Sequence, residues 1–331
     1  MKKYSQNQIE KFIKKIQQQK IIVIGDIMLD QFIWGKVNRI SPEAPVPVVH
    51  VTHESAYPGG AANVARNLAD FGTHVTMSSV LGNDVNGDKL IRLLKKSRIA
   101  SDGISTMDGY PTIVKTRIIA RHQQVVRVDR ESLQPINKDV LETLLHKIET
   151  IIREMDAVII EDYGKGFITQ ELVNKVISIC HANDKIVTVD PNPNNSIKWS
   201  GVTLIKPNRS EAYAAAGVPF DENEKTLYTV GEKLLKKWDV NYLLITLGED
   251  GLMLFHPPDT PFFTPTRARE VFDVSGAGDT VIAFFTAALA AGLTGAEAAQ
   301  MANHAAGIVV GKLGTATLTP AELLKSFQHN D

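Results

Sequence analysis

A chain of 331 residues that is 44% hydrophobic can bury a large core, so its length suits one enzyme-sized domain with a small appendage. Its formal net charge of -1 provides no overall positive field, which argues against general nucleic-acid binding. The single cysteine, Cys180, excludes a disulfide within the chain. Because the sequence shows neither an apolar signal core nor about eighteen consecutive apolar residues, we expect a cytoplasmic protein without membrane association.

The first elements predict an α/β fold. An amphipathic helix over about 5–18 precedes the β-branched run 21–24, which is typical of a buried parallel strand. Asp26 and Asp30 follow that strand. Ligands of open α/β sheets gather at the carboxyl ends of strands, so both carboxylates are expected near a site. Asp26 fits a structural cap equally well.

Residues 31–52 and 112–121 have a different pattern. Short strands are expected at Gln31–Lys36 and Val46–Val51, and the segment between them is rich in proline, which disfavours a central strand. A return strand is expected over Thr112–Ala120. We interpret these segments as a small β lid, a device that excludes water from reacting groups. Its exposed apolar faces also suit a homodimer contact.

The return strand carries cations on one face. Its period-two alternation places Lys115, Arg117 and Arg121 together, and the next expected strand, Val125–Arg130, adds more positive charge. Such a face is either simply solvated or holds an anion.

A glycine turn at Gly59 and Gly60 starts the next helix, expected over 61–70. Asn63 lies in the first turn of this helix. Its side chain can cap the helix or donate to a ligand.

Regular β/α alternation follows from residue 137 onward. Three apolar strands, at 157–160, 186–189 and 202–205, are each followed by a polar and partly acidic loop. Because the ends of parallel strands share one sheet edge, these loops predict an active-site rim. Asn208 and Glu211, three residues apart at a helix start, can face a hydrated magnesium ion or form a capping box.

The last glycine-rich turn, 272–280, opens a long apolar helix. Backbone N–H groups at Gly276, Ala277 and Gly278 lack intrahelical partners and point toward one spot, which suits a phosphate. A Walker loop is excluded because no Lys-Ser or Lys-Thr pair follows the glycines. A Rossmann fingerprint fits poorly, since Val281 replaces its third glycine and only about fifty residues remain. Asp279 places a carboxylate inside this anion site, whose helix N-terminus should lower its pKa.

Two stretches resemble the signatures of the ribokinase-like (PfkB) sugar kinases. These are 58–65 and 273–279, more than two hundred residues apart and in the order typical of the family. Ser275 stands where many members carry threonine. The resemblance implies an open, mostly parallel α/β sheet with helices on both faces plus a small β lid, in a single kinase domain over 1–331.

The same resemblance implies ATP and Mg²⁺ as cofactors, with a monovalent cation near Asp273. It makes Asp279 the catalytic base and uses the N–H groups of Gly276, Ala277 and Gly278 to stabilise the transferring phosphoryl group. The resemblance further implies that the sugar is bound by Asp30, Gly59, Gly60, Asn63, Asp162 and Lys165. It implies that Mg²⁺ is held through water by Asn208 and Glu211, and that the nucleotide is contacted by Thr246, Gly248, Gly251 and Asn303.

A narrower likeness, to the bacterial heptose kinases of lipopolysaccharide-core synthesis, rests on 35–48, 114–124, 162–166 and 190–192. It implies transfer to the anomeric hydroxyl of D-glycero-β-D-manno-heptose 7-phosphate, giving the 1,7-bisphosphate. Lys115, Arg117 and Arg121 would then clamp the 7-phosphate.

Many such proteins continue into a nucleotidyltransferase domain with a His-x-Gly-His motif, which this sequence lacks. We therefore expect a stand-alone kinase, with adenylyl transfer on another polypeptide. The alternatives are a PfkB kinase for fructose, ribose or a hexose phosphate, a non-catalytic sugar or nucleotide sensor, and a Rossmann dehydrogenase.

Overall fold

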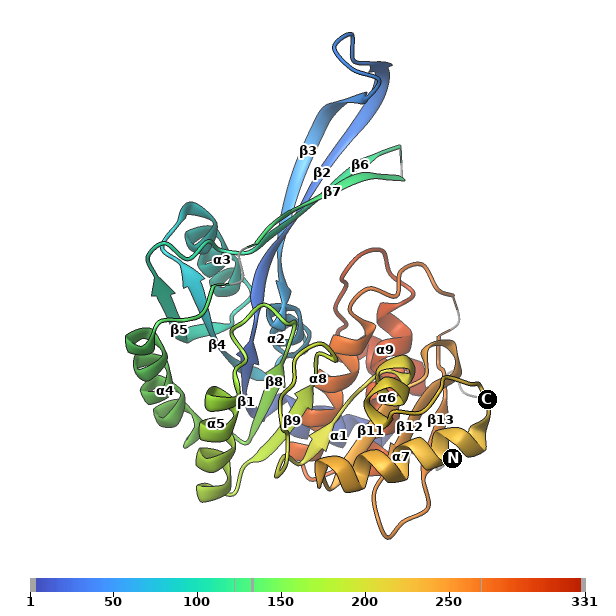
Figure 1. Ribbon diagram of the computed structural model, residues 1–331. Helices are drawn as coiled ribbons and strands as arrows, with labels where there is room; N and C mark the ends of the chain where they lie inside the picture. The colour runs from blue at the N-terminus through green and yellow to red at the C-terminus, as the bar shows by residue number, and fades with distance from the viewer. Residues whose placement is uncertain (1–3, 122, 132–133, 269, 329–331) are drawn as a thin grey trace.

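A computed structural model describes residues 4–121, 123–131, 134–268 and 270–328, and shows a body from which a narrow sheet projects (Figure 1). The helices are α1 (Gln6–Gln17), α2 (Ala61–Phe71), α3 (Val85–Lys96), α4 (Lys138–Ile152), α5 (Gln170–Ala182), α6 (Arg209–Ala216), α7 (Glu224–Trp238), α8 (Ala277–Ala290), α9 (Gly295–Val309) and α10 (Pro320–Gln328), with a 3-10 turn at Gly248–Asp250. The strands are β1 (Lys20–Gly25), β2 (Ile27–Ile40), β3 (Pro47–Gly60), β4 (His74–Gly82), β5 (Ala100–Met107), β6 (Val114–Ala120), β7 (Gln123–Arg130), β8 (Ala157–Glu161), β9 (Ile186–Asp190), β10 (Leu204–Ile205), β11 (Tyr242–Thr246), β12 (Gly251–Phe255) and β13 (Phe262–Pro265).

The body is built on a sheet which, in the described part of the chain, has nine strands in the order β13-β12-β11-β10-β9-β8-β1-β4-β5. From β11 to β5 every neighbouring pair is parallel, and β12 and β13 are added antiparallel at one edge. The strands β8, β9 and β10 are adjacent and parallel. The loops that follow them therefore meet at one edge, as the sequence predicts.

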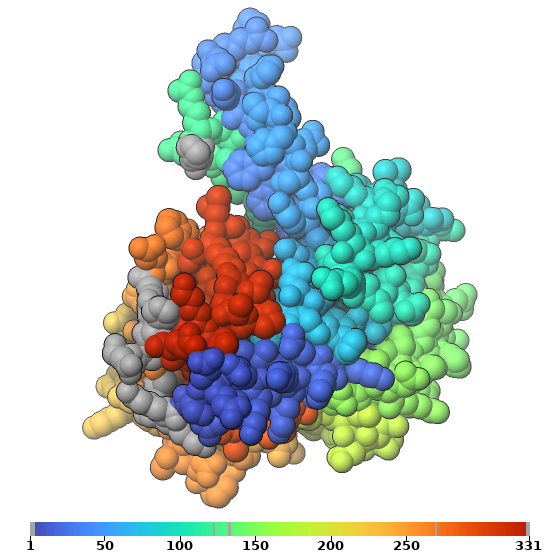
Figure 2. Space-filling view, turned by 180° about the vertical axis from the view of Figure 1, so that it is seen from behind, coloured from blue at the N-terminus to red at the C-terminus, as the bar shows by residue number. Residues whose placement is uncertain are grey.

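Apolar residues on alternate positions of β1 build a core on each face of the sheet. Ile21 and Val23 pack into a core that includes residues of α1, α2, α8, α9 and α10. Ile22 and Ile24 point to the other face, where residues of α4, α5, α6 and α7 complete a second core. Viewed from behind, α1 lies against the C-terminal elements, with which it shares the first core (Figure 2).

The projecting sheet has the order β3-β2-β6-β7 and forms the lid. Its strands β2 and β3 are longer than predicted and run back to the body, and β7 belongs to the same sheet. The pairing brings one row of side chains to a common position across the sheet: Tyr57 on β3, Asp30 on β2, Lys115 on β6 and Asp129 on β7. These side chains share one face because paired residues of neighbouring strands point the same way.

The structure confirms the predicted α/β class, the mostly parallel sheet and the helices on both faces. β5, α7, β13 and α10 were not predicted from the sequence. Cys180, on α5, is buried in the second core. Within the described ranges, no helix is long and apolar enough to cross a bilayer.

Candidate active site

Asp279 lies in the first turn of α8 and is held by two hydrogen bonds from distant parts of the chain. The side-chain amide of Asn63, from the start of α2, donates to Oδ2 at 2.7 Å. The hydroxyl of Tyr163, from the loop after β8, donates to Oδ1 at 2.8 Å. The two contacts join the start of α2, the loop after β8 and α8 around one carboxylate.

Gly276 is the N-cap of α8 and has a left-handed backbone conformation, with φ of 80°. A Cβ at this position would lie 2.7 Å from the Asn63 side-chain nitrogen. Glycine is therefore needed both for the turn and for the space that the Asn63 amide occupies. The next N–H, that of Ala277, donates to the carbonyl of Val274 at 3.2 Å, so an incoming anion would have to exchange this bond.

Burial raises the pKa of Asp279 above its ordinary value, contrary to the lowering expected from the helix N-terminus. Hydrogen bonds from Asn63 and Tyr163 and the charge of Lys206 oppose this effect without cancelling it. The loss of hydration thus outweighs the favourable dipole and donors. A proton acceptor with a raised pKa is a stronger base than an exposed aspartate.

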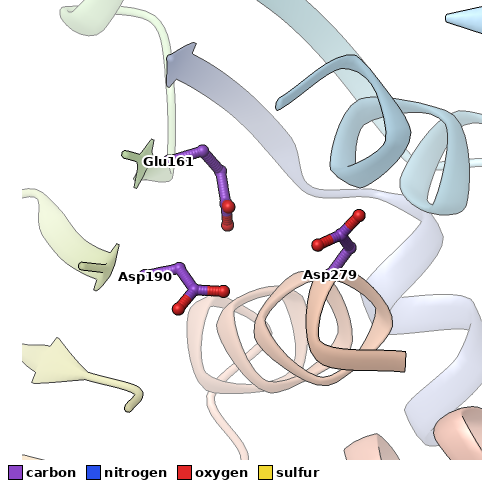
Figure 3. Close-up of side chains that lie close together, drawn as sticks. All are labelled: Glu161, Asp190 and Asp279. Carbon is purple, nitrogen blue, oxygen red and sulfur yellow. The ribbon is translucent and has the colours of Figure 1, made fainter. Parts of the chain in front are cut away.

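Three carboxylates converge beside the start of α8 (Figure 3). Oxygen atoms of Glu161, Asp190 and Asp279 all lie within 4.8 Å of one another. Glu161 comes from the end of β8 and is 1% exposed, and its Oε1 has no hydrogen-bond partner in the described structure. Burial and the neighbouring carboxylates raise its pKa well above the ordinary value.

Lys206, which the sequence analysis did not single out, supplies a positive charge to this cluster. Its Nζ lies 2.8 Å from Asp190 Oδ2, and the residue is 3% exposed. The ammonium group also borders Gly278 in the first turn of α8. A buried cation here faces the spot at which the α8 N-terminus would meet an anion.

A cavity of about 970 Å³ opens over these groups. Its lining joins α8, α9 and the loops after β8, β9, β10 and β11. The predicted residues that it brings together are Asp162, Asn208, Glu211, Thr246, Gly248, Gly251, Ala277, Gly278, Asp279 and Asn303. This volume is large enough for a nucleotide-sized ligand.

Asn208 and Glu211 line the cavity but also form a capping box. Asn208 Oδ1 accepts from the Glu211 N–H at 2.9 Å, and Glu211 Oε2 accepts from the Asn208 N–H at 2.8 Å. The capping box is therefore confirmed, and the magnesium role of the same two residues stays a prediction. Asn303 is held at the opposite wall, where its side chain donates to Thr264 Oγ1 at 2.9 Å and to the Pro265 carbonyl.

On the lid side, Asp30 is buried and pairs with Arg117. A Cβ at Gly59 would overlap the Asp30 carboxylate, so the glycine turn and this acid must be close together. The Arg117 guanidinium also lies over the Phe32 ring, 5.3 Å from its centroid. The lid therefore presents an acid, a cation and an aromatic ring next to the turn that carries Asn63.

Asp26 has the structural role that was one of its two interpretations. Its carboxylate accepts from the backbone N–H groups of Tyr163 at 3.0 Å, Lys165 at 3.2 Å and Phe167 at 3.2 Å. Burial raises its pKa to about 6. Asp26 thus fixes the loop from which the Tyr163 hydroxyl reaches Asp279.

The predicted cationic clamp is not one cluster. Lys115 lies 3.1 Å from Asp129 and 3.6 Å from Glu131. Arg121 lies six residues further along, in the turn after β6, where it contacts the side chain of Asn38. Six residues of strand span roughly 20 Å, so Lys115 and Arg121 do not converge on one phosphate. Lys165, from the loop after β8, lies 2.9 Å from Glu131 instead.

Asp273 binds backbone rather than a side-chain cation. Its Oδ1 accepts from the Ser275 N–H at 2.9 Å and its Oδ2 from the Gly314 N–H at 3.1 Å. These bonds tie the turn before α8 to the loop after α9. They also help to lower the pKa of Asp273.

The sheet order, the projecting lid and the carboxylate at the α8 N-terminus place the molecule among the proteins with a ribokinase fold. Arabidopsis thaliana ribokinase, solved with ribose and ATP, superposes with a TM-score of 0.75 at 20% identity, over 95% of this chain and 100% of that one. Escherichia coli phosphofructokinase-2, solved with potassium, gives 0.75 at 17% identity, over 94% and 99%.

A family model described as pfkB family carbohydrate kinase matches residues 18–322, and the chain belongs to this family. Two curated relatives are both named bifunctional protein HldE. The one from Pelobacter propionicus is 42% identical over 98% of this chain, and the one from Geobacter metallireducens is 44% identical over 94%. The chain spans 66% and 64% of their respective lengths.

Proposed function

We propose that the protein transfers the γ-phosphoryl group of ATP to the anomeric hydroxyl of D-glycero-β-D-manno-heptose 7-phosphate. The product would be the 1,7-bisphosphate, a step toward ADP-heptose and the lipopolysaccharide core. Membership of the pfkB family supports a sugar kinase. The likeness of 35–48 and 114–124 to heptose kinases supports the substrate.

The observation that carries the proposal is the position of Asp279. Its carboxylate lines the cavity at the start of α8, is oriented on both oxygens, and has a raised pKa. A group that only capped the helix would not need donors from α2 and from the β8 loop. This arrangement suits a base that must meet a hydroxyl and a phosphoryl group at one point.

In the proposed reaction, Asp279 accepts the proton of the anomeric hydroxyl as its oxygen attacks the γ-phosphorus. The bond from that phosphorus to the oxygen bridging it to the β-phosphate breaks, and ADP leaves. The transferring group is faced by the N–H groups of Gly276 and Gly278 and by the Lys206 ammonium group. The N–H of Ala277 can join them if its hydrogen bond to the Val274 carbonyl breaks. Such preorganised positive groups usually provide the largest catalytic effect.

The residues around Glu161 fit a divalent cation, since three carboxylates face a single buried lysine and one of their oxygens has no partner in the described structure. Mg²⁺ would neutralise phosphate charge in this place. Glu161 and Asp190 offer direct oxygen ligands, and Asn208 and Glu211, which line the same cavity, are proposed to act through water. A monovalent cation near Asp273 remains part of the proposal.

Asp30 and Asn63 are proposed to orient the sugar, together with Gly59, Gly60 and Asp162. Thr246, Gly248, Gly251 and Asn303 are proposed to contact the nucleotide, because they line one cavity with the α8 N-terminus.

We also propose a homodimer formed through the lid. Apolar side chains of β7, Val125, Val126 and Val128, are exposed, as are Val46 and Val51 next to and on β3. A lid with this many exposed valines is suited to a partner surface.

ADP release from ATP, measured with a panel of sugars, tests the function. Heptose 7-phosphate should be turned over with a higher kcat/KM than fructose 6-phosphate, ribose or unphosphorylated heptose. Preference for another sugar would keep the kinase and change its substrate. No ADP release with any of these sugars would favour a sensor.

A further inference from the structure

A carboxylate lies between two lysines where the lid meets the body. Glu131 Oε2 is 2.9 Å from Lys165 Nζ and 3.6 Å from Lys115 Nζ, and its Oε1 accepts from Lys165 at 3.0 Å. Lys115 belongs to β6 of the lid, and Lys165 belongs to the loop after β8 in the body. The side chains of Lys115 and Lys165 are 14% and 18% exposed, so both are largely withdrawn from solvent.

Both lysines are close in the fold to the groups proposed to hold the sugar and the base. Lys115 is paired with Asp30 across β6 and β2, so the two side chains lie on the same face of the lid. Lys165 is two residues from Tyr163, and both have their backbone N–H groups bound to Asp26. A ligand that spans from Asp279 to Asp30 would have its far end near these lysines.

The three acids of this region differ in how firmly they are paired. Asp129 accepts from Arg127 through two nitrogen atoms, at 2.9 and 2.8 Å, and also from Lys115 at 3.1 Å, and Asp30 pairs with Arg117. The planar guanidinium group binds a carboxylate with fixed geometry. Glu131 is instead paired with lysines, which act as point charges, and it follows the last residue of β7. Of these acids, Glu131 is the one whose contacts an incoming anion can most readily replace.

Charge also favours an exchange. Four positive charges, those of Lys115, Lys165, Arg117 and Arg127, face the carboxylates of Asp30, Asp129 and Glu131. One positive charge is therefore in excess among these seven groups. A phosphate monoester carries about two negative charges at neutral pH and three acceptor oxygens, against one charge and two oxygens for a carboxylate. Two ammonium groups therefore attract it more strongly than they attract Glu131.

We propose that Lys115 and Lys165 form the subsite for the phosphate that the sugar already carries, and that Glu131 occupies this subsite until the substrate displaces it. The proposal rests on the proposed function, which it refines. Arg121 takes no part. A sugar without a phosphate leaves Glu131 in place and gains nothing from the two lysines, so the exchange selects phosphorylated sugars.

Titration calorimetry with inorganic phosphate tests the subsite without catalysis. The protein is first saturated with Mg²⁺ and a non-hydrolysable ATP analogue, so that the α8 N-terminus is already occupied. Glu131→Gln should bind phosphate about tenfold more tightly than the wild type, because the competing charge is gone. Lys115→Met and Lys165→Met should each weaken binding about tenfold or more. Glu149→Gln, which changes an exposed acid paired with Arg153 on α4, is the matched control and should leave the affinity unchanged.

Steady-state kinetics give a second measurement. Lys165→Met should raise the KM for heptose 7-phosphate by a larger factor than it raises the KM for ATP or for unphosphorylated heptose. Equal or weaker phosphate binding in Glu131→Gln, or unaltered binding in both lysine variants, would overturn the subsite. If phosphate binding follows the predicted order but no sugar phosphate is phosphorylated, the subsite stands and the proposed function fails.

Discussion

Replacing Tyr163 by phenylalanine removes one hydroxyl and tests how Asp279 is held. The hydroxyl donates to Asp279 Oδ1 at 2.8 Å, and its own loop is fixed by the Asp26 carboxylate. A hydrogen bond to a charged group contributes about 1.5–3 kcal/mol, which corresponds to roughly a 10- to 150-fold loss of turnover if all of it serves the reacting state. Because this bond favours the ionised carboxylate, its loss should raise the pKa of Asp279 further.

The assay is the pH dependence of kcat and kcat/KM with ATP and heptose 7-phosphate. In Tyr163→Phe the acidic limb should move to higher pH and kcat should fall, while the KM for ATP stays close to that of the wild type. A carboxyl ¹³C signal assigned to Asp279 through Asp279→Asn gives the same pKa shift without substrate. Tyr228→Phe is the control, since that hydroxyl donates to Glu224 on α7. A phenylalanine variant with wild-type kcat and an unmoved acidic limb would refute this role of Tyr163.

Further predictions concern the groups around Asp279. Lys206→Met should weaken ATP binding at least tenfold, and it should lower the free energy of unfolding by about 3–5 kcal/mol because Asp190 loses its buried partner. Calorimetry measures the ATP affinity and urea unfolding measures the stability. An unchanged ATP affinity would count against a contact between Lys206 and a phosphate. Asp26→Ala should cost about 3 kcal/mol of stability, since three N–H groups lose their acceptor, and unfolding curves matching the wild type would contradict this. In the wild type, kcat/KM should fall on the acidic side at a pH above the ordinary aspartate pKa of about 4, because burial raises the pKa of Asp279 and its proton-free form must act. An acidic limb at or below that value would contradict the assignment of Asp279 as the base.

The sequence predicts the sheet and the position of Asp279 because both depend on local patterns. Short β-branched runs such as 21–24 indicate buried parallel strands, and a glycine turn before an apolar helix indicates a possible anion site. The predicted lowering of the Asp279 pKa was wrong, because the direction of the shift depends on how completely α2 and the loop after β8 exclude water from the carboxylate. No local pattern contains that information.

The hydrogen-bond partners of the polar residues could not be predicted from local sequence patterns either. Asn63 was expected to contact a sugar, and in the structure its amide donates to Asp279, 216 positions away in the chain. Tyr163 lies in the 162–166 stretch that resembles the heptose kinases, but neither it nor Lys206 was assigned a role from the sequence, because their contacts form only where the ends of several strands meet. The even spacing of Lys115 and Arg121 places them on one face, but strand rise separates them too far to act together.

The central claim is that Asp279 accepts the proton of the sugar hydroxyl, and Asp279→Asn tests it most directly. The amide retains the shape of the side chain and removes its basicity. Turnover of heptose 7-phosphate should fall by about two to four orders of magnitude, while calorimetry shows nearly unchanged affinity for a non-hydrolysable ATP analogue. An asparagine variant that releases ADP at the wild-type rate would contradict the account.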